Sequence, residues 1–112
     1  MTTRELELLQ GTLDVLVLRA LSWGPKHGYA VARFIREGSK DAFKVLDGAL
    51  YTSLHRMEER AWVESEWGTS DKGKRAKFYQ LRAPGRSELR RRVRSWEQYV
   101  ATVTRVLGTA PA

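Results

Sequence analysis

Apolar residues recur at helical spacing in four segments of the chain. In the first segment they are three or four positions apart, as on one face of an α-helix, at Leu6, Leu9, Leu13, Leu16 and Ala20. Thr2 and Glu5 form a capping box that predicts the start of this helix. Gly11 lowers the helix propensity by up to about 1 kcal/mol relative to alanine, which allows a break there.

Two shorter helices are predicted to follow. One covers residues 26–37, and we expect Gly38 to end it in the left-handed conformation. Its buried residues are predicted to be Tyr29, Ile35 and either Val31 or Ala32. The other helix covers residues 47–60, with Asp47 as its N-cap. Its buried stripe is predicted to contain Leu50, Leu54 and Met57.

A β-hairpin is predicted after these helices. Residues 62–67 and 75–81 are rich in aromatic and alternating side chains, and residues 68–74 between them are typical of a turn in which Gly73 supplies a positive φ. Because neighbouring residues of a strand point to opposite faces, Arg75 and Lys77 should share one face.

The last predicted helix covers residues 84–107 and would be roughly 36 Å long. Six apolar residues follow a heptad spacing along it: Leu89, Val93, Trp96, Val100, Val103 and Leu107. A helix longer than the domain before it would project part of this seam into water, so we expect a second copy of the chain to cover it. The dimer interface is predicted to include this seam together with Leu6, Leu9 and Leu13.

Composition limits the class of protein. A chain of 112 residues suits a single compact unit, here divided into a domain at 1–82, a dimerisation helix at 83–107 and a disordered tail at 108–112. The absence of cysteine excludes disulfides and thiol catalysis. We expect no membrane span and no signal peptide, and therefore a cytoplasmic protein.

The positive charge is concentrated in one part of the chain. Residues 72–94 contain ten Lys or Arg and one Glu, whereas the other residues together have a slight negative balance. This localisation favours contact with a polyanion over general solubility. A solvated helix face with neighbouring arginines is the plainer interpretation of the same charges.

Three short helices followed by a basic hairpin are typical of a winged helix-turn-helix. The expected fold class is therefore mainly α with a small β-hairpin, followed by the long C-terminal helix. The third helix would enter the major groove of DNA while the hairpin contacts phosphates. The predicted DNA-binding residues are Ala49, Tyr51, Thr52, Ser53, His55 and Arg56 on the helix and Lys72, Lys74, Arg75 and Lys77 on the hairpin. An ordinary polar helix face is the alternative.

The chain resembles the PadR family of bacterial transcriptional regulators, in the short subfamily with one C-terminal helix. The matching stretches are residues 9–14, 24–29, 48–51, 54–58, 66–68, 75–81 and 85–86. Thr52 replaces a frequent proline, and Ala61 replaces the usual glycine. The resemblance implies a homodimeric winged-helix repressor that is released by a small-molecule inducer. Because two reading helices would contact half-sites one helical turn or a multiple of it apart, we expect an inverted-repeat operator.

The sequence allows two roles for Trp96. It either stacks across the dimer or, as the resemblance implies, binds a planar aromatic or phenolic effector. In the second case Val15, Arg19 and Ser22 would line the pocket with it. His27 is predicted to cap or pack at the start of the second helix, and His55 either contacts DNA or is simply exposed.

The predicted function is a sequence-specific, DNA-binding repressor in the cytoplasm. Non-specific nucleic-acid binding and a ligand-binding module without DNA specificity remain alternatives. We expect no enzyme activity, no cofactor and no metal site, because the chain contains no catalytic set, nucleotide loop or metal-ligand cluster.

Overall fold

The computed structural model describes residue 8 and residues 11–111, which form four helices and a small sheet. The predicted capping box and the predicted interface residues Leu6 and Leu9 lie outside the described residues. The first helix, α1 (Thr12–Leu21), begins directly after Gly11, whose φ is 85°. The glycine that weakened the sequence pattern is therefore the point where the described helix starts.

Helices α2 (Gly28–Gly38) and α3 (Asp47–Glu59) complete a three-helix arrangement around one apolar core. The residues with the largest fully buried side chains are Val17, Leu18, Leu21, Val31, Leu50, Ser53, Leu54, Met57 and Val63. The predicted stripe of α3 is confirmed, as is the burial of Ile35. Tyr29 was wrongly assigned to the core, because its side chain is 62% exposed. Gly38 does not adopt positive φ; Lys40 and Asp41 after it do.

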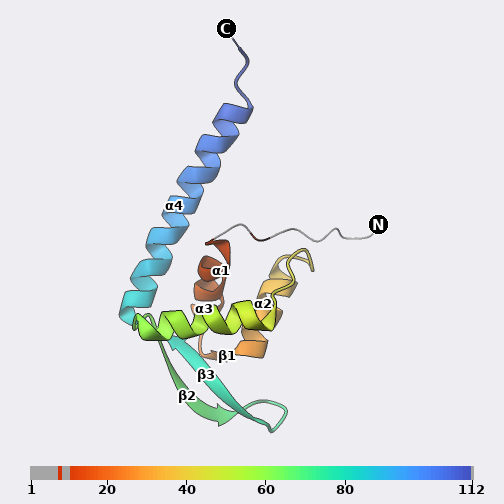
Figure 1. Ribbon diagram of the computed structural model, residues 1–112, viewed down its shortest axis with the longest axis vertical. Coiled ribbons are helices and arrows are strands. Elements are labelled where there is room, and N and C mark those ends of the chain that lie inside the picture. Colours follow the sequence, from red (N-terminus) through yellow and green to blue (C-terminus); the bar gives the residue numbers. More distant parts are fainter. Residues whose placement is uncertain (1–7, 9–10, 112) are drawn as a thin grey trace.

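A three-stranded antiparallel sheet contains the predicted hairpin. Strands β2 (Val63–Thr69) and β3 (Arg75–Leu81) pair from Val63 opposite Leu81 to Thr69 opposite Arg75, and Gly73 in the turn has φ 75°. A two-residue strand β1 (Lys26–His27), too short to predict, pairs with the free edge of β3. Three short helices with this hairpin at their side form a winged helix (Figure 1).

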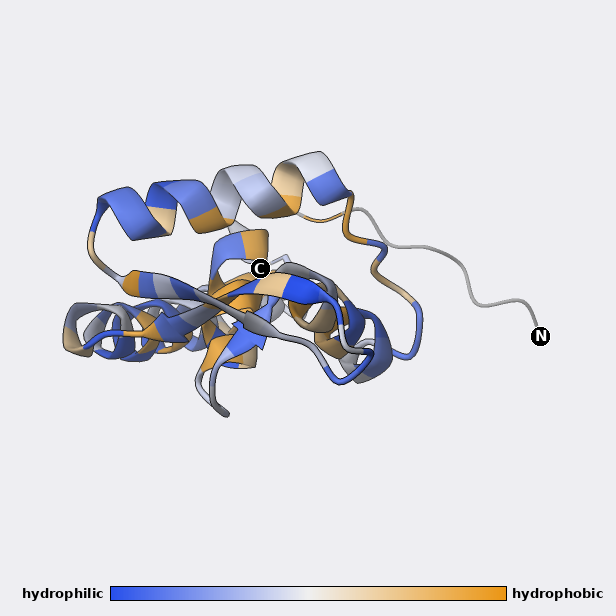
Figure 2. Ribbon diagram, turned by 90° about the horizontal axis from the view of Figure 1, so that it is seen from below, coloured by the Kyte–Doolittle hydropathy of each residue, from blue (hydrophilic) through white to orange (hydrophobic). Residues whose placement is uncertain are grey.

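The hydrophobic parts of the ribbon gather between the helices and the sheet, and most outer turns are hydrophilic (Figure 2).

Ala61, which links α3 to the hairpin, has φ 59°. A non-glycine residue in that region costs about 1 kcal/mol. The sharp turn is retained because Trp62 immediately afterwards donates its N–H to the carbonyl of Met57 at 2.9 Å.

Helix α4 (Ala83–Leu107) has the predicted bounds within one residue and extends well beyond the rest of the molecule (Figure 1). Its first part packs on the core through Leu89 and Val93. Leu89 is only 6% exposed in the single chain, because the domain's own core already covers it, and its role in a dimer interface stays a prediction. From Trp96 onward the apolar residues are exposed.

Glu88 in the first part of α4 accepts hydrogen bonds from Arg91 and Arg92. The bond from Arg91, followed by that from Arg92, lowers the pKa of this carboxyl from 4.5 to about 2. A carboxylate with a depressed pKa in the folded state stabilises the fold above its unfolded pKa, and this stabilisation is lost as pH falls.

Replacing Glu88 with glutamine is therefore expected to lower the free energy of unfolding at pH 7 by about 1 kcal/mol, since solvent screens part of the interaction. The difference between the two proteins should shrink between pH 5 and about pH 2. Thermal unfolding followed by circular dichroism across this range measures it. A difference that stays constant with pH would contradict the assignment of the low pKa to Glu88.

Candidate nucleic-acid interface

Four of the predicted contact positions lie on the outer face of α3. Ala49, Tyr51, Thr52 and His55 are all exposed. The His55 Nε2 lies 3.1 Å from a carboxylate oxygen of Glu59 one turn later. The helix therefore presents a methyl group, two hydroxyls and an imidazole, a varied set of groups that can contact base edges or phosphates.

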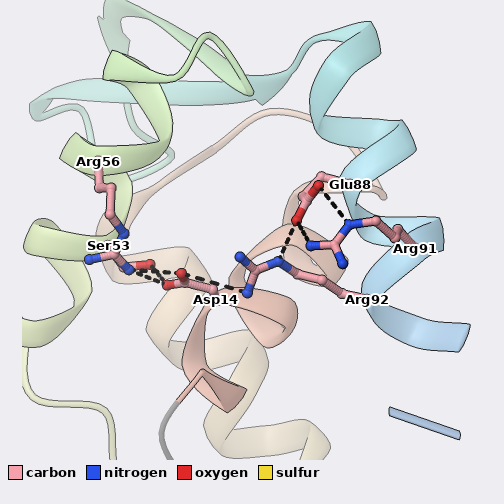
Figure 3. A network of polar contacts seen from close by, with 6 residues as sticks. All are labelled: Asp14, Ser53, Arg56, Glu88, Arg91 and Arg92. Atoms are coloured by element: carbon pink, nitrogen blue, oxygen red, sulfur yellow. Dashed lines mark hydrogen bonds and ion pairs between the residues drawn. The ribbon is translucent and has the colours of Figure 1, made fainter. Parts of the chain in front are cut away.

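Two predicted members of this face point inward instead. Ser53 is 2% exposed, and its hydroxyl donates to Asp14 Oδ1 at 2.6 Å. Arg56 Nη2 donates to both oxygens of Asp14, at 2.7 and 2.8 Å, and the side chain is 37% exposed (Figure 3). The prediction that both face outward was wrong, because Asp14 is buried and draws these donors towards it. A sequence signal existed: Asp14 lies one turn before Val17 and Leu18, on the buried face of α1.

The hairpin carries its cations where predicted, with one exception. Lys72, Lys74 and Arg75 are exposed near its tip. The guanidinium of Arg75 lies 4.7 Å from the centre of the Trp67 ring, and the ammonium of Lys72 lies 5.9 Å from that of Tyr29. Lys77 is less free than expected, because its Nζ pairs with Glu58 at 3.4 Å.

A groove of about 590 Å³ separates the hairpin from the start of α2 and from α3. Its lining combines phenol rings, an indole and cations, including Tyr29, Arg33, Tyr51, Trp67, Lys74 and Arg75. Gly28 allows the Tyr51 ring to reach this groove, since a Cβ at residue 28 would lie 2.8 Å from the Tyr51 hydroxyl. Hydroxyl donors and cations around one groove suit a phosphate backbone.

His27 caps α2, as predicted. Its Nδ1 accepts a hydrogen bond from the N–H of Ala30 at 3.1 Å, and its ring packs edge-on against Phe78 at 5.4 Å. Within the described part of the chain, no three His, Asp or Glu side chains are grouped so that they could hold a metal ion.

A second cavity, of about 480 Å³, lies between the start of α1 and the middle of α4. Val15 and Trp96 line it as predicted, and Trp96 stacks on Tyr99 with ring centres 6.2 Å apart. Arg19 and Ser22 do not line it; the Ser22 hydroxyl donates to the Arg19 carbonyl instead. From α1, the cavity is lined by Thr12 and Val15, and its cations come from α4 through Arg91 and Arg92.

Comparison with known proteins identifies the family. The family model described as "Transcriptional regulator PadR-like family" matches residues 17–91, which include the core helices, the hairpin and the start of α4. The chain belongs to the PadR-like family of transcriptional regulators. PadR-like proteins are DNA-binding regulators and not a known family of enzymes.

Similar solved structures support the same assignment. A PadR family transcription regulator from Clostridium difficile is 28% identical with a TM-score of 0.76, covering 88% of this chain and 100% of that chain. A PadR family regulator from Eggerthella lenta is also 28% identical with a TM-score of 0.78, and the match covers 90% of this chain and 86% of that chain. An uncharacterised protein from Lysinibacillus sphaericus is 24% identical over 82% of this PadR-like chain and 84% of its own length.

None of the helices in the described part of the chain combines the length and the hydrophobicity that a membrane span requires.

Proposed function

We propose that this PadR-like regulator is a homodimeric, sequence-specific repressor that a small planar aromatic molecule releases from DNA. The observation that carries the proposal is that Tyr51, on the exposed face of α3, lines one groove together with the cations of the hairpin. Thr52 and His55 of α3 would contact base edges, and Lys74 and Arg75 would contact the flanking phosphates. Contacts of both kinds on one side of the domain favour a sequence-specific protein over a purely electrostatic one.

The proposed dimer explains the exposed part of α4. Trp96, Val100, Val103 and Leu107 form an apolar stripe that the protomer leaves uncovered. A second copy would cover this stripe with the same stripe of its own, as two-fold interfaces do. Two α3 helices would then meet half-sites about 34 Å apart, or a multiple of that distance, so the operator should be an inverted repeat.

The proposed effector site is the cavity beside Trp96. The indole and the Tyr99 ring offer flat apolar surfaces to a planar ring, which prefers offset or edge-on contacts with aromatic side chains. A cavity of about 480 Å³ has room for a molecule of two or three rings.

Fluorescence anisotropy tests the proposed specificity. We expect the dimer to bind DNA from upstream of its own gene about 1,000-fold or more tightly than a scrambled duplex of equal length and base content, at about 150 mM salt. Equal affinity for both duplexes, together with a steep salt dependence, would instead favour non-specific nucleic-acid binding.

Two sets of substitutions should have different effects on DNA binding. Replacing both Lys74 and Arg75 with alanine is expected to weaken binding to every duplex and to reduce the salt slope by up to about 2, since two phosphate contacts are lost. Replacing Thr52 with alanine should mainly reduce the ratio between the specific and the scrambled duplex. Titrations at four salt concentrations separate the two effects. Proportional losses on both duplexes for Thr52→Ala would contradict a base-reading role of this residue.

A further inference from the structure

One buried carboxylate joins three helices of the domain. Asp14 in the first turn of α1 accepts hydrogen bonds from Ser53 and Arg56 of α3, and its Oδ2 lies 3.9 Å from Arg92 Nη1 of α4 (Figure 3). Among the residues that the structure describes, Asp14 is the one charged residue that is buried. A buried charge is stabilised by only a few partners. Displacement of one partner of Asp14 therefore changes the contacts that join the three helices.

Arg92 belongs to this cluster and also lines the cavity beside Trp96. Its Nε donates to Glu88 at 2.8 Å, and its guanidinium lies 5.4 Å from the centre of the Trp62 ring. The side chain is 23% exposed, so it remains accessible from the cavity. Arg92 and Asp14 form an ion pair at 3.9 Å, which is longer than a hydrogen bond. An additional anion can therefore displace Arg92 from Asp14 more easily than it can displace Arg56, which lies 2.7 Å from the same carboxylate.

The charge of the cavity indicates which ligands it favours. Two of its lining residues, Arg91 and Arg92, are cations, and none is acidic. Thr12 and Ser95 add hydroxyl groups. Glu88 pairs with both arginines from outside the lining, and Asp14 pairs with Arg92 and Arg56, so this cluster has three cations and two anions and a net positive charge.

We propose that Asp14 and Arg92 couple this cavity to the DNA-reading helix and that the ligand is a planar aromatic anion. This inference rests on the proposed function and adds its route of regulation. The anionic group of the ligand pairs with Arg92 and competes with Asp14 for it. Because Asp14 holds α3 through Ser53 and Arg56, loss of the contact with α4 changes how firmly α3 is held relative to the proposed dimerisation helix. Arg92 is thus a positioning residue for DNA binding, without touching DNA.

Calorimetry with the full chain and two matched probes tests the ligand class. 2-Naphthoate is expected to bind about 10-fold more tightly than the neutral 2-naphthamide, and Arg92→Gln should remove most of this preference. Equal binding of the two compounds, or no binding of naphthoate, would overturn the proposal.

Hydrogen exchange of the α3 amides tests the coupling without DNA. Saturating naphthoate is expected to increase exchange in residues 47–59 of the unsubstituted protein by about fivefold or more, whereas Arg92→Gln should show the faster exchange without ligand and no further increase with it. Arg91→Gln is the matched control, since Arg91 lines the same cavity but pairs with Glu88, and it should retain the effect at saturation. An equal ligand effect in Arg92→Gln and the unsubstituted protein would overturn the coupling.

DNA titrations then distinguish failure of this inference from failure of the proposed function. If the upstream duplex binds specifically, naphthoate should weaken that binding by about fivefold or more. Arg92→Gln should have the weaker DNA affinity without ligand and show no further loss with naphthoate. Specific binding that naphthoate does not weaken would overturn only the coupling. Absence of specific binding would overturn the proposed function, and the α3 exchange would still decide whether Asp14 and Arg92 couple the two sites.

Discussion

Replacing Val103 with aspartate is expected to leave the protein monomeric at micromolar concentration and to lower its affinity for a two-half-site duplex by about 100-fold. Val103 lies on the uncovered apolar stripe of α4 and is 39% exposed in the single chain. A carboxylate there would have to lose its hydration against apolar groups of the second copy, and two copies would bring like charges together. The loss on DNA follows because two linked binding modules typically gain a factor of 100 or more over one.

Gln98→Asp provides the control for this substitution. It introduces the same charge into the same exposed helix but lies outside the heptad seam, so dimerisation and DNA affinity should be retained. Sedimentation velocity and anisotropy measure the two properties on the same samples. A Val103→Asp protein that remains dimeric would show that the stripe on α4 is not the interface.

Replacing Gly85 with alanine is expected to lower the free energy of unfolding by about 3 kcal/mol or more. At this position α4 begins directly against the chain that links α3 to the hairpin, and an added Cβ would lie 2.1 Å from the carbonyl oxygen of Trp62. That oxygen accepts the N–H of Arg82 at 2.9 Å, which restricts its movement. Overpacking against backbone is costly because no side chain can rotate away.

Gly38→Ala is the matched control for Gly85→Ala. Gly38 also lies in a helix, but an added Cβ meets no atom within 4 Å. This substitution should leave stability unchanged or raise it by up to about 1 kcal/mol through helix propensity. Thermal unfolding at one fixed protein concentration compares both variants, since dimerisation would make the midpoint concentration-dependent. Similar midpoints for Gly85→Ala and the unsubstituted protein would mean that the start of α4 can shift freely.

Local sequence signals predicted most of the architecture. The heptad seam predicted α4 because the spacing of apolar residues follows directly from the helix repeat. Gly11 marked the start of the described α1, and Gly73 marked the hairpin turn, since each has the positive φ that glycine tolerates. His27 was predicted at the start of α2, where it caps the helix through a neighbour only three residues away. All these features depend on residues close together in the chain.

The prediction was least accurate where partners distant in sequence decide the direction of a side chain. Ser53 and Arg56 turn inward because Asp14, about forty residues earlier, is buried and accepts their hydrogen bonds. Lys77 is held by Glu58.

By itself, the sequence determined the helices, the hairpin, the concentration of charge and the family resemblance, because periodicity, turn chemistry and composition act locally. Only the tertiary structure decided which polar residues of α3 remain available to DNA and which cations line the cavity beside Trp96. The reason is that hydrogen bonds and ion pairs of buried groups form between helices whose relative positions no local pattern specifies.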